Sequence, residues 1–328
     1  MTVRRQLLLV LVGSALAAPL TVLAQPPSRA KRIGFLWDAD SPGELRLIDA
    51  FRAGLRELGY VQDRDYVIEQ RSAKGNHHLL PALAAELLAL KVDLIVATSN
   101  PSAMATRGAT RDVPIVSIGD PDPVGSGLVA SLRRPGGNVT GLSSQTPELV
   151  IKHLDLLRQI VPNLRRVGFL YPADNTAVVA IFARLESECG KLQIQCIRAA
   201  VRQEQDIPGA FGVLQRGKAQ ALIVSTSTVI SAWRDTVIDH AARHRLPAIY
   251  GPSVIVEAGG LISYASSGLA RFRRAAVYAD KIFKGAKPGD LPIEQPTKFD
   301  LVVNMKTAKA LGITIPQSIL VRADRVIE

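Results

Sequence analysis

The sequence IGFLW at residues 33–37 is an uninterrupted apolar run, and it determines the class of fold. A strand that is apolar at every position is typical of a parallel sheet whose two faces are both covered by helices. Residues 44–58 follow with apolar side chains at helical spacing, and the next residue, Gly59, suits the end of a helix. Together the two segments predict the first strand–helix unit of an α/β protein.

The same alternation continues along the chain. Further strands are expected at residues 66–71, 94–98, 114–118, 139–143, 166–171, 194–199, 221–226, 247–250, 261–265 and 299–303. A second series of alternating helices and strands begins with a helix over residues 148–160. The chain also has 328 residues, which is more than a single hydrophobic core usually contains. These features predict two Rossmann-like lobes with parallel sheets.

The N-terminal 24 residues have the pattern of a secretory signal. Arg4 and Arg5 precede an apolar segment at residues 6–18, and small or β-branched residues at 22–24 give an acceptable cleavage site before Gln25. The apolar run is short for a membrane span. The arginine pair also fits a twin-arginine signal loosely, so both the Sec and the twin-arginine route stay open. We expect the signal to be removed and the mature protein to lie in the periplasm.

The net charge and the cysteine content restrict the possible functions less than the N-terminal segment does. The formal net charge is +11, but the basic residues are scattered and never form a run of five, which indicates a solvated surface rather than a nucleic-acid site. The two cysteines, Cys189 and Cys196, are expected at the end of a helix and in the next strand. An oxidising compartment permits a disulfide between them, although two buried thiols are the simpler expectation.

Motifs for catalysis are missing from the sequence. It contains neither a Gly-x-Ser-x-Gly elbow nor a phosphate-binding loop of the Gly-x-x-x-x-Gly-Lys-Ser/Thr type. His240 and His244 are four residues apart, as two metal ligands on a helix would be, but they lack the glutamate of the zinc protease motif and have arginines beside them. We therefore predict no catalytic residues, no metal and no cofactor.

Polar side chains follow many of the predicted strands. Ligands of open α/β sheets bind beyond the carboxyl ends of the strands, so two facing lobes would form one ligand cleft. The candidates from the first lobe are Trp37, Ser41, Ser99, Asn100, Ser102 and Asp122. Those from the second lobe are Tyr171, Asp174, Asn175, Thr226, Ser227, Thr228 and Tyr250. These groups suit a polar small molecule, and helix N-termini after Thr98 and Thr226 would favour an anionic group such as a carboxylate.

Several longer motifs resemble those of one protein family. They are RPGGNVTG at 134–141, EAGGL at 257–261, KGAKP at 284–288, LPIEQPTKF at 291–299 and NMKTAKALGITIP at 304–316. With Asp122-Pro-Val and the opening strand, they are similar to ABC-transporter substrate-binding proteins of the tryptophan/tyrosine-type uptake family. The resemblance implies a type I periplasmic-binding fold, with about three crossing segments and closure of the lobes on the ligand.

The resemblance also implies lobe boundaries and a function. We expect a first lobe from residues 31–145 and 266–290, and a second lobe from residues 146–265 and 291–328. The expected function is a periplasmic, monomeric receptor that delivers a small polar ligand to an ABC-type permease in the inner membrane. A sensor partner that presents the ligand to a signalling receptor, or a periplasmic enzyme on the same scaffold, is the alternative.

One position departs from the pattern of the best-understood relatives, which bind aromatic amino acids. An acidic residue often stands there where this chain has Ser227, and a serine cannot supply a charge for an α-ammonium group. Ser144 likewise replaces an acid, whereas Asp122, Asp174 and Asn175 match the pattern. The resemblance implies an amino-acid-like ligand, but the departure at Ser227 argues against an ordinary amino acid and leaves a neutral or a carboxylate-bearing molecule open, of which the basic net charge favours the latter.

Overall fold

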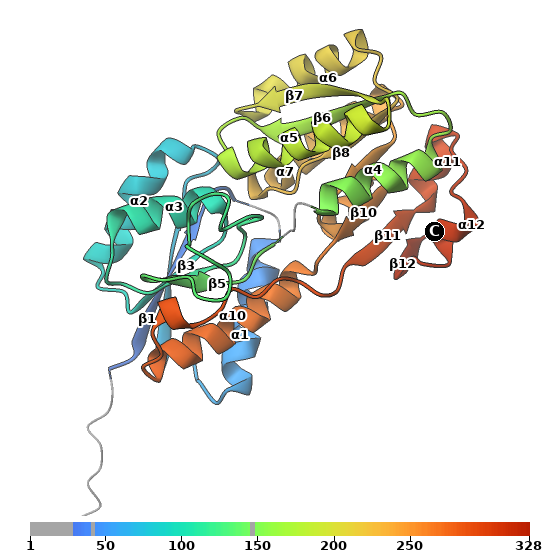
Figure 1. Ribbon diagram of the computed structural model, residues 1–328. Helices are drawn as coiled ribbons and strands as arrows, with labels where there is room; N and C mark the ends of the chain where they lie inside the picture. The colour runs from blue at the N-terminus through green and yellow to red at the C-terminus, as the bar shows by residue number, and fades with distance from the viewer. Residues whose placement is uncertain (1–28, 41–42, 145–147) are drawn as a thin grey trace, which may run out of the picture.

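The computed structural model describes residues 29–40, 43–144 and 148–328. The expected signal segment and Ser41 lie outside these ranges. The described chain forms two α/β lobes, each built around its own sheet (Figure 1). Within these ranges, no helix combines the length and the apolar character that a membrane crossing requires.

The first lobe contains a five-stranded sheet in the order β2-β1-β3-β4-β5, and all its neighbouring strands are parallel. The strands are β1 (Lys31–Trp37), β2 (Tyr66–Ser72), β3 (Leu94–Ala97), β4 (Ile115–Ser117) and β5 (Val139–Gly141). The helices are α1 (Glu44–Glu57), α2 (Leu80–Ala89), α3 (Asn100–Ala109) and, from much later in the chain, α10 (Gly268–Phe283), with short 3-10 turns at His77–Leu79 and Pro288–Asp290. The helices α1 and α10 lie side by side under the sheet (Figure 1).

The second lobe contains a seven-stranded sheet in the order β12-β11-β10-β9-β8-β6-β7. The strands are β6 (Arg166–Pro172), β7 (Gln195–Val201), β8 (Ala221–Val224), β9 (Ala248–Tyr250), β10 (Ile262–Ala265), β11 (Asp300–Asn304) and β12 (Arg325–Ile327). The helices are α4 (Glu148–Ile160), α5 (Thr176–Lys191), α6 (Ile207–Arg216), α7 (Thr228–Ala232), α8 (Arg234–Arg243), α9 (Ser253–Glu257), α11 (Met305–Leu311) and α12 (Gln317–Leu320), with a 3-10 turn at Glu204–Asp206.

One strand pair of the second sheet differs from the expected parallel arrangement. β11 is antiparallel to β10, with Ala265 opposite Asp300, whereas the other neighbouring pairs are parallel. The reason lies in the path of the chain. β10 ends where the chain leaves the second lobe, and β11 begins where the chain returns, so the two strands run in opposite directions from the same edge.

Two crossings between the lobes lie next to each other. The first follows Ser144, and the second is the short segment between β10 and α10. They are tied together because the Ser266 hydroxyl donates a hydrogen bond to the Ser144 carbonyl oxygen at 2.9 Å.

The third crossing lies later than the boundary expected at residue 290. The amide of Ile293 donates to the Leu132 carbonyl at 2.7 Å, and the amide of Glu294 donates to the Gly141 carbonyl at 3.0 Å. The side chain of Ile293 is also buried in the first lobe. The chain therefore leaves the first lobe only after residue 294 and enters β11 at Asp300.

The two cysteines form a disulfide rather than two buried thiols. Cys189 near the end of α5 is bonded to Cys196 in β7, with the Cα atoms 6.4 Å apart. The turn between the two elements explains this proximity. Gln193 adopts a positive φ of 55°, and the Ile194 amide donates to the Cys189 carbonyl at 2.8 Å, so the chain folds directly back along the helix.

Candidate functional site

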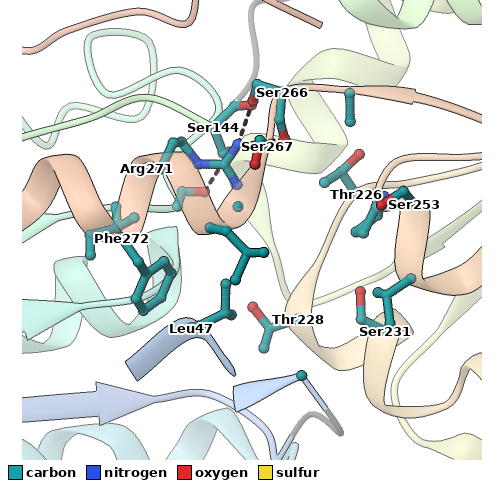
Figure 2. A pocket seen from close by; sticks show the side chains of 18 of the residues that line it. Leu47, Ser144, Thr226, Thr228, Ser231, Ser253, Ser266, Ser267, Arg271 and Phe272 are labelled. Atoms are coloured by element: carbon teal, nitrogen blue, oxygen red, sulfur yellow. Dashed lines mark hydrogen bonds between the residues drawn. The ribbon is translucent and has the colours of Figure 1, made fainter. Parts of the chain in front are cut away.

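A cavity of about 220 Å³ lies between the lobes (Figure 2). The first lobe contributes the carboxyl ends of β1, β3 and β4 and the start of α1, and the second lobe contributes the loops after β8 and β9. The segment that crosses from β10 to α10 lines the cavity between them. The described lining residues are Trp37, Gly43, Arg46, Leu47, Thr98, Ile118, Gly119, Ser144, Thr226, Ser227, Thr228, Ser231, Pro252, Ser253, Val254, Glu257, Ala265, Ser266, Ser267, Gly268, Leu269, Arg271, Phe272 and Asp300.

Hydroxyl groups make up much of this lining, and several of them begin helices. Ser227 is the N-cap of α7, where its Oγ accepts a hydrogen bond from the Ile230 amide at 3.1 Å. Ser267 caps α10 in the same way by accepting from the Ala270 amide at 3.2 Å. Serine is favoured at such positions because its oxygen satisfies an amide that the helix leaves unpaired. These caps place hydroxyl groups from the second lobe and from the crossing around one space (Figure 2).

An apolar wall closes the first-lobe side of the cavity. Trp37 and Phe272 stack with their ring centroids 5.6 Å apart and an interplanar angle of 13°, and Phe35 stacks beneath Trp37 at 5.9 Å. Leu47 of α1 lies beside Phe272 in the same lining (Figure 2). Only 2% of Trp37 is exposed, so the wall is part of the hydrophobic core as well as part of the cavity.

Four charged residues also line the cavity: Arg46, Glu257, Arg271 and Asp300. Arg46 of the first lobe forms an ion pair with Glu257 of the second lobe at 3.7 Å, which connects α1 to α9 across the cavity. Asp300 is paired with Lys298 at 3.2 Å. Burial lowers the pKa of Arg271 to about 10, which still leaves its guanidinium charged at neutral pH.

The structure brings together four of the residues that the sequence suggested for a site. Trp37, Thr226, Ser227 and Thr228 all line the cavity. Ser99 and Ser102 instead form a capping box at the start of α3. The side-chain amide of Asn100 donates to the Asp120 carboxylate at 2.7 Å, and burial raises the pKa of Asp120. These polar groups hold the loops behind the cavity.

The other suggested residues lie away from the cavity lining. Asp122 accepts a hydrogen bond from the Gly125 amide within its own turn. Tyr171 packs against Phe169 and Phe182, Asp174 pairs with Arg202, Asn175 caps α5, and Tyr250 is buried in the second-lobe core. The strand order explains this for Tyr171, Asp174 and Asn175. The cavity lies at the ends of β8, β9 and β10, whereas β6 is nearer the far edge of the sheet.

Other lining residues did not emerge from the sequence. They include Ser266, Ser267, Arg271 and Phe272 at the crossing into α10, and Arg46 and Leu47 at the start of α1. A signal for the first group was present, because Ser-Ser-Gly follows the strand expected at 261–265 and has the composition of a helix cap. The lining residues of α1 lack such a signal, because a helix of the first lobe is not a strand end.

The histidine pair is not part of this cavity. His240 and His244 stack on each other, and both rings also contact Phe211. Across residues 29–40, 43–144 and 148–328, no group of three or more His, Cys, Asp or Glu side chains is arranged to hold a metal ion.

A buried histidine behind the cavity gives a pH prediction. His153 is 2% exposed, its Nε2 lies 2.7 Å from the Tyr264 carbonyl oxygen, and burial lowers its pKa to about 4. An unfolded histidine titrates near pH 6.5. Between these two pH values His153 is protonated in the unfolded chain but neutral in the folded protein. The free energy of unfolding should therefore fall by about 3 kcal/mol as the pH drops from roughly 6.5 to 4.

Urea unfolding of the purified protein at a series of pH values would measure this effect. The variant His153→Gln keeps an amide that can donate to Tyr264 but cannot titrate. The difference in stability between the two proteins should therefore change through this pH range. A difference that is constant with pH would contradict the prediction.

Comparison with known proteins shows the family to which most of the chain is similar. A family model described as ABC transporter substrate binding protein matches residues 35–327. A tyrosine-binding protein of Clostridioides difficile (strain R20291) is 27% identical over 289 residues, which cover 87% of this chain and 82% of the relative.

Two solved structures are also similar. One is an ABC domain from Streptococcus pneumoniae in complex with L-Trp, with 28% identity, a TM-score of 0.84, and coverage of 91% of this chain and 100% of that chain. The other is the ligand-free, open structure of a substrate-binding protein from Clostridium difficile, with 26% identity, a TM-score of 0.65, and coverage of 91% and 99%.

Proposed function

Because the chain belongs to the family of ABC transporter substrate-binding proteins, we propose that it is a periplasmic, monomeric receptor whose ligand site is the cavity between the lobes. The family and its amino-acid-bound members support the role of a solute-binding receptor. In that role it binds a small molecule and passes it to an ABC permease. The permease and its ATPase supply the energy of transport, and this chain supplies selectivity.

The observation that carries the choice of site is that both lobes line one cavity. A ligand in it touches the loops after β8 and β9, the ends of β1 and β3, and the crossing into α10. Such a ligand favours the closed arrangement, because only there are all these contacts made at once. The similarity to the L-Trp complex is also greater than that to the ligand-free, open relative, which supports a closed arrangement of the lobes.

The lining suits a ligand with an apolar body and several polar groups. Trp37, Leu47 and Phe272 form one wall, and nine of the described lining residues carry hydroxyl groups. L-tyrosine and L-tryptophan are the first compounds to test, because the relatives bind them. Ser227 offers no charge to an α-ammonium group, and its oxygen is used as a helix cap. The test should therefore include compounds without an amino group.

A thermal-shift screen of the purified protein against L-tyrosine, L-tryptophan and a panel of small metabolites tests this function. A compound that binds only the folded protein stabilises it by about 2.7 kcal/mol at a concentration of 100 times its Kd. Calorimetric titration would then give the affinity of each compound that raises the Tm, and mass spectrometry would show whether it is recovered unchanged. Turnover of such a compound would contradict a purely receptor role.

Two matched variants would locate the site. Thr228 and Thr176 are the first residues of α7 and α5, but only Thr228 lines the cavity. Thr228→Trp should fill the cavity and weaken binding by about 100-fold or more, equivalent to at least about 2.7 kcal/mol. Thr176→Trp adds the same side chain at an exposed position and should bind as the unmodified protein does. Equal binding by both variants would place the site elsewhere.

A further inference from the structure

Arg271 is held at the junction of two crossings. Its Nη1 donates hydrogen bonds to the carbonyl oxygen of Ser266 at 3.0 Å and to the Ser266 hydroxyl. The same hydroxyl donates to the Ser144 carbonyl at 2.9 Å. Figure 2 shows the guanidinium beside Ser266 and Ser267. The arginine is thus fixed in place where the cavity meets the two crossings.

The charge of Arg271 has no acidic partner among the described residues. On the same helix, Arg273 is paired with Glu57 and Arg274 with Glu294. Nε of Arg271 is buried without a hydrogen-bond partner, and its Nη2 makes no hydrogen bond within the described chain. Nη2 is therefore the guanidinium nitrogen that is neither paired with nor enclosed by the described residues, and a hydrogen bond from it to a carboxylate would be strong because both groups are charged.

The acids that share the cavity already face other cations. Glu257 is paired with Arg46 and with Arg325, and Asp300 is paired with Lys298. These pairs leave the positive charge of Arg271 uncompensated within the described lining. A buried charge without a partner is costly, and burial lowers the pKa of Arg271 to about 10 for this reason. An anionic group of a ligand would remove that cost.

We propose that Arg271 binds the carboxylate of the ligand through its Nη2, so that the cavity selects small carboxylic acids over their neutral analogues. This inference rests on the receptor function proposed above and deepens it by naming the ligand class. The Ser267 hydroxyl, which accepts from the Ala270 amide and keeps its own proton, is a donor beside the same carboxylate. The Trp37–Phe272 wall contacts the apolar body of the ligand. Selectivity then depends on a negative charge rather than on an α-ammonium group.

Matched pairs of compounds separate the charge from the rest of the ligand. The panel contains benzoate and benzamide, 3-(4-hydroxyphenyl)propanoate and its amide, L-tyrosine and L-tyrosinamide, L-tryptophan and L-tryptophanamide, and the carboxylate-free amine tyramine. Hydrogen bonds to a charged group contribute about 1.5–3 kcal/mol, so at least one acid should bind roughly 10 to 100 times more tightly than its amide. Thermal shift followed by calorimetric titration on the full purified protein measures the ratio.

Variants of two arginines on α10 complete the test. Arg271→Gln should abolish the preference for acid over amide while leaving amide binding within a few-fold, and Arg271→Lys, which keeps the charge but loses the planar guanidinium, should retain part of it. Arg273→Gln is the control, because this exposed arginine pairs with Glu57 outside the cavity. It should leave the preference unchanged. Circular dichroism and melting curves establish that each variant is folded.

The outcomes distinguish this inference from the receptor function. If the amides or tyramine bind as tightly as the acids, Arg271 does not bind a ligand carboxylate. The inference is then overturned, but the receptor function is still supported. If Arg271→Gln weakens acids and amides equally, the arginine only positions the crossing, and the inference is again overturned. If no compound of this panel or of the wider metabolite screen binds, the receptor function and the inference both fail.

Discussion

Replacing Trp37 with alanine is expected to lower the free energy of unfolding by about 3–5 kcal/mol. The indole is 2% exposed and lies between Phe35 and Phe272, with ring centroids 5.9 and 5.6 Å away. Phe272 belongs to α10, which is distant in sequence, so the cavity left by alanine would open between two segments of the first lobe. Urea or thermal unfolding of the variant measures the loss.

Trp37→Phe is the matched control for this variant. It keeps an aromatic ring in the stack and removes the indole Nε1, which is buried without a hydrogen-bond partner among the described residues. Because no hydrogen bond is lost there, the cost should be much smaller than for alanine, about 1.5 kcal/mol or less. If phenylalanine and alanine destabilise the protein equally, the aromatic stack is not what stabilises this part of the first lobe.

A methyl group at Gly141 is expected to cost about 4 kcal/mol, because it combines steric overlap with an unfavourable backbone conformation. Gly141 has a φ of 138°, and a Cβ there would lie 1.9 Å from the carbonyl oxygen of Ser117. That oxygen belongs to the neighbouring strand β4, in register with Gly141, and so cannot move aside without breaking the sheet. Gly141→Ala should show the loss in chemical unfolding.

Gly108→Ala provides the opposite expectation. Gly108 lies in α3, is exposed, and has open space where its Cβ would be. Alanine is favoured over glycine in a helix by about 0.5–1 kcal/mol, so this variant should be slightly more stable than the unmodified protein. A similar loss in both glycine variants would mean that the tight contact at Gly141 is not the cause.

The two-lobed α/β fold could be predicted from the sequence, and the solved relatives confirm it as the type I periplasmic-binding architecture. Buried parallel strands such as 33–37 are apolar throughout, and that local pattern is readable without a structure. The direction of β11 was not readable in this way. The direction of β11 depends on where the chain re-enters the second lobe. The strand β12 was also not predicted, because it is a three-residue edge strand with little apolar character.

The candidate site was predictable only in part. The rule that ligands lie at strand ends identified Trp37 and residues 226–228, which line the cavity. The rule could not tell which strand ends border the cavity, because that depends on the order of the strands in the sheet. Tyr171 near the end of β6 and Asn175 after it stay predictions as ligand contacts, while the structure places both outside the cavity lining. Arg271 was missed because it lies on a helix of the first lobe, just after a crossing, and not at the end of a strand.

The position of α10 in the chain has a consequence for biosynthesis. The first lobe begins near residue 31, but α10 at Gly268–Phe283 covers its core, and Phe272 stacks on Trp37. A ribosome releases the chain from its N-terminus, so Phe35, Trp37 and Phe51 lack part of their partner surface until more than 280 residues have been made. Contacts this distant in sequence slow folding and leave apolar surface exposed for longer. The first lobe to be synthesised is therefore unable to finish folding before the second has emerged.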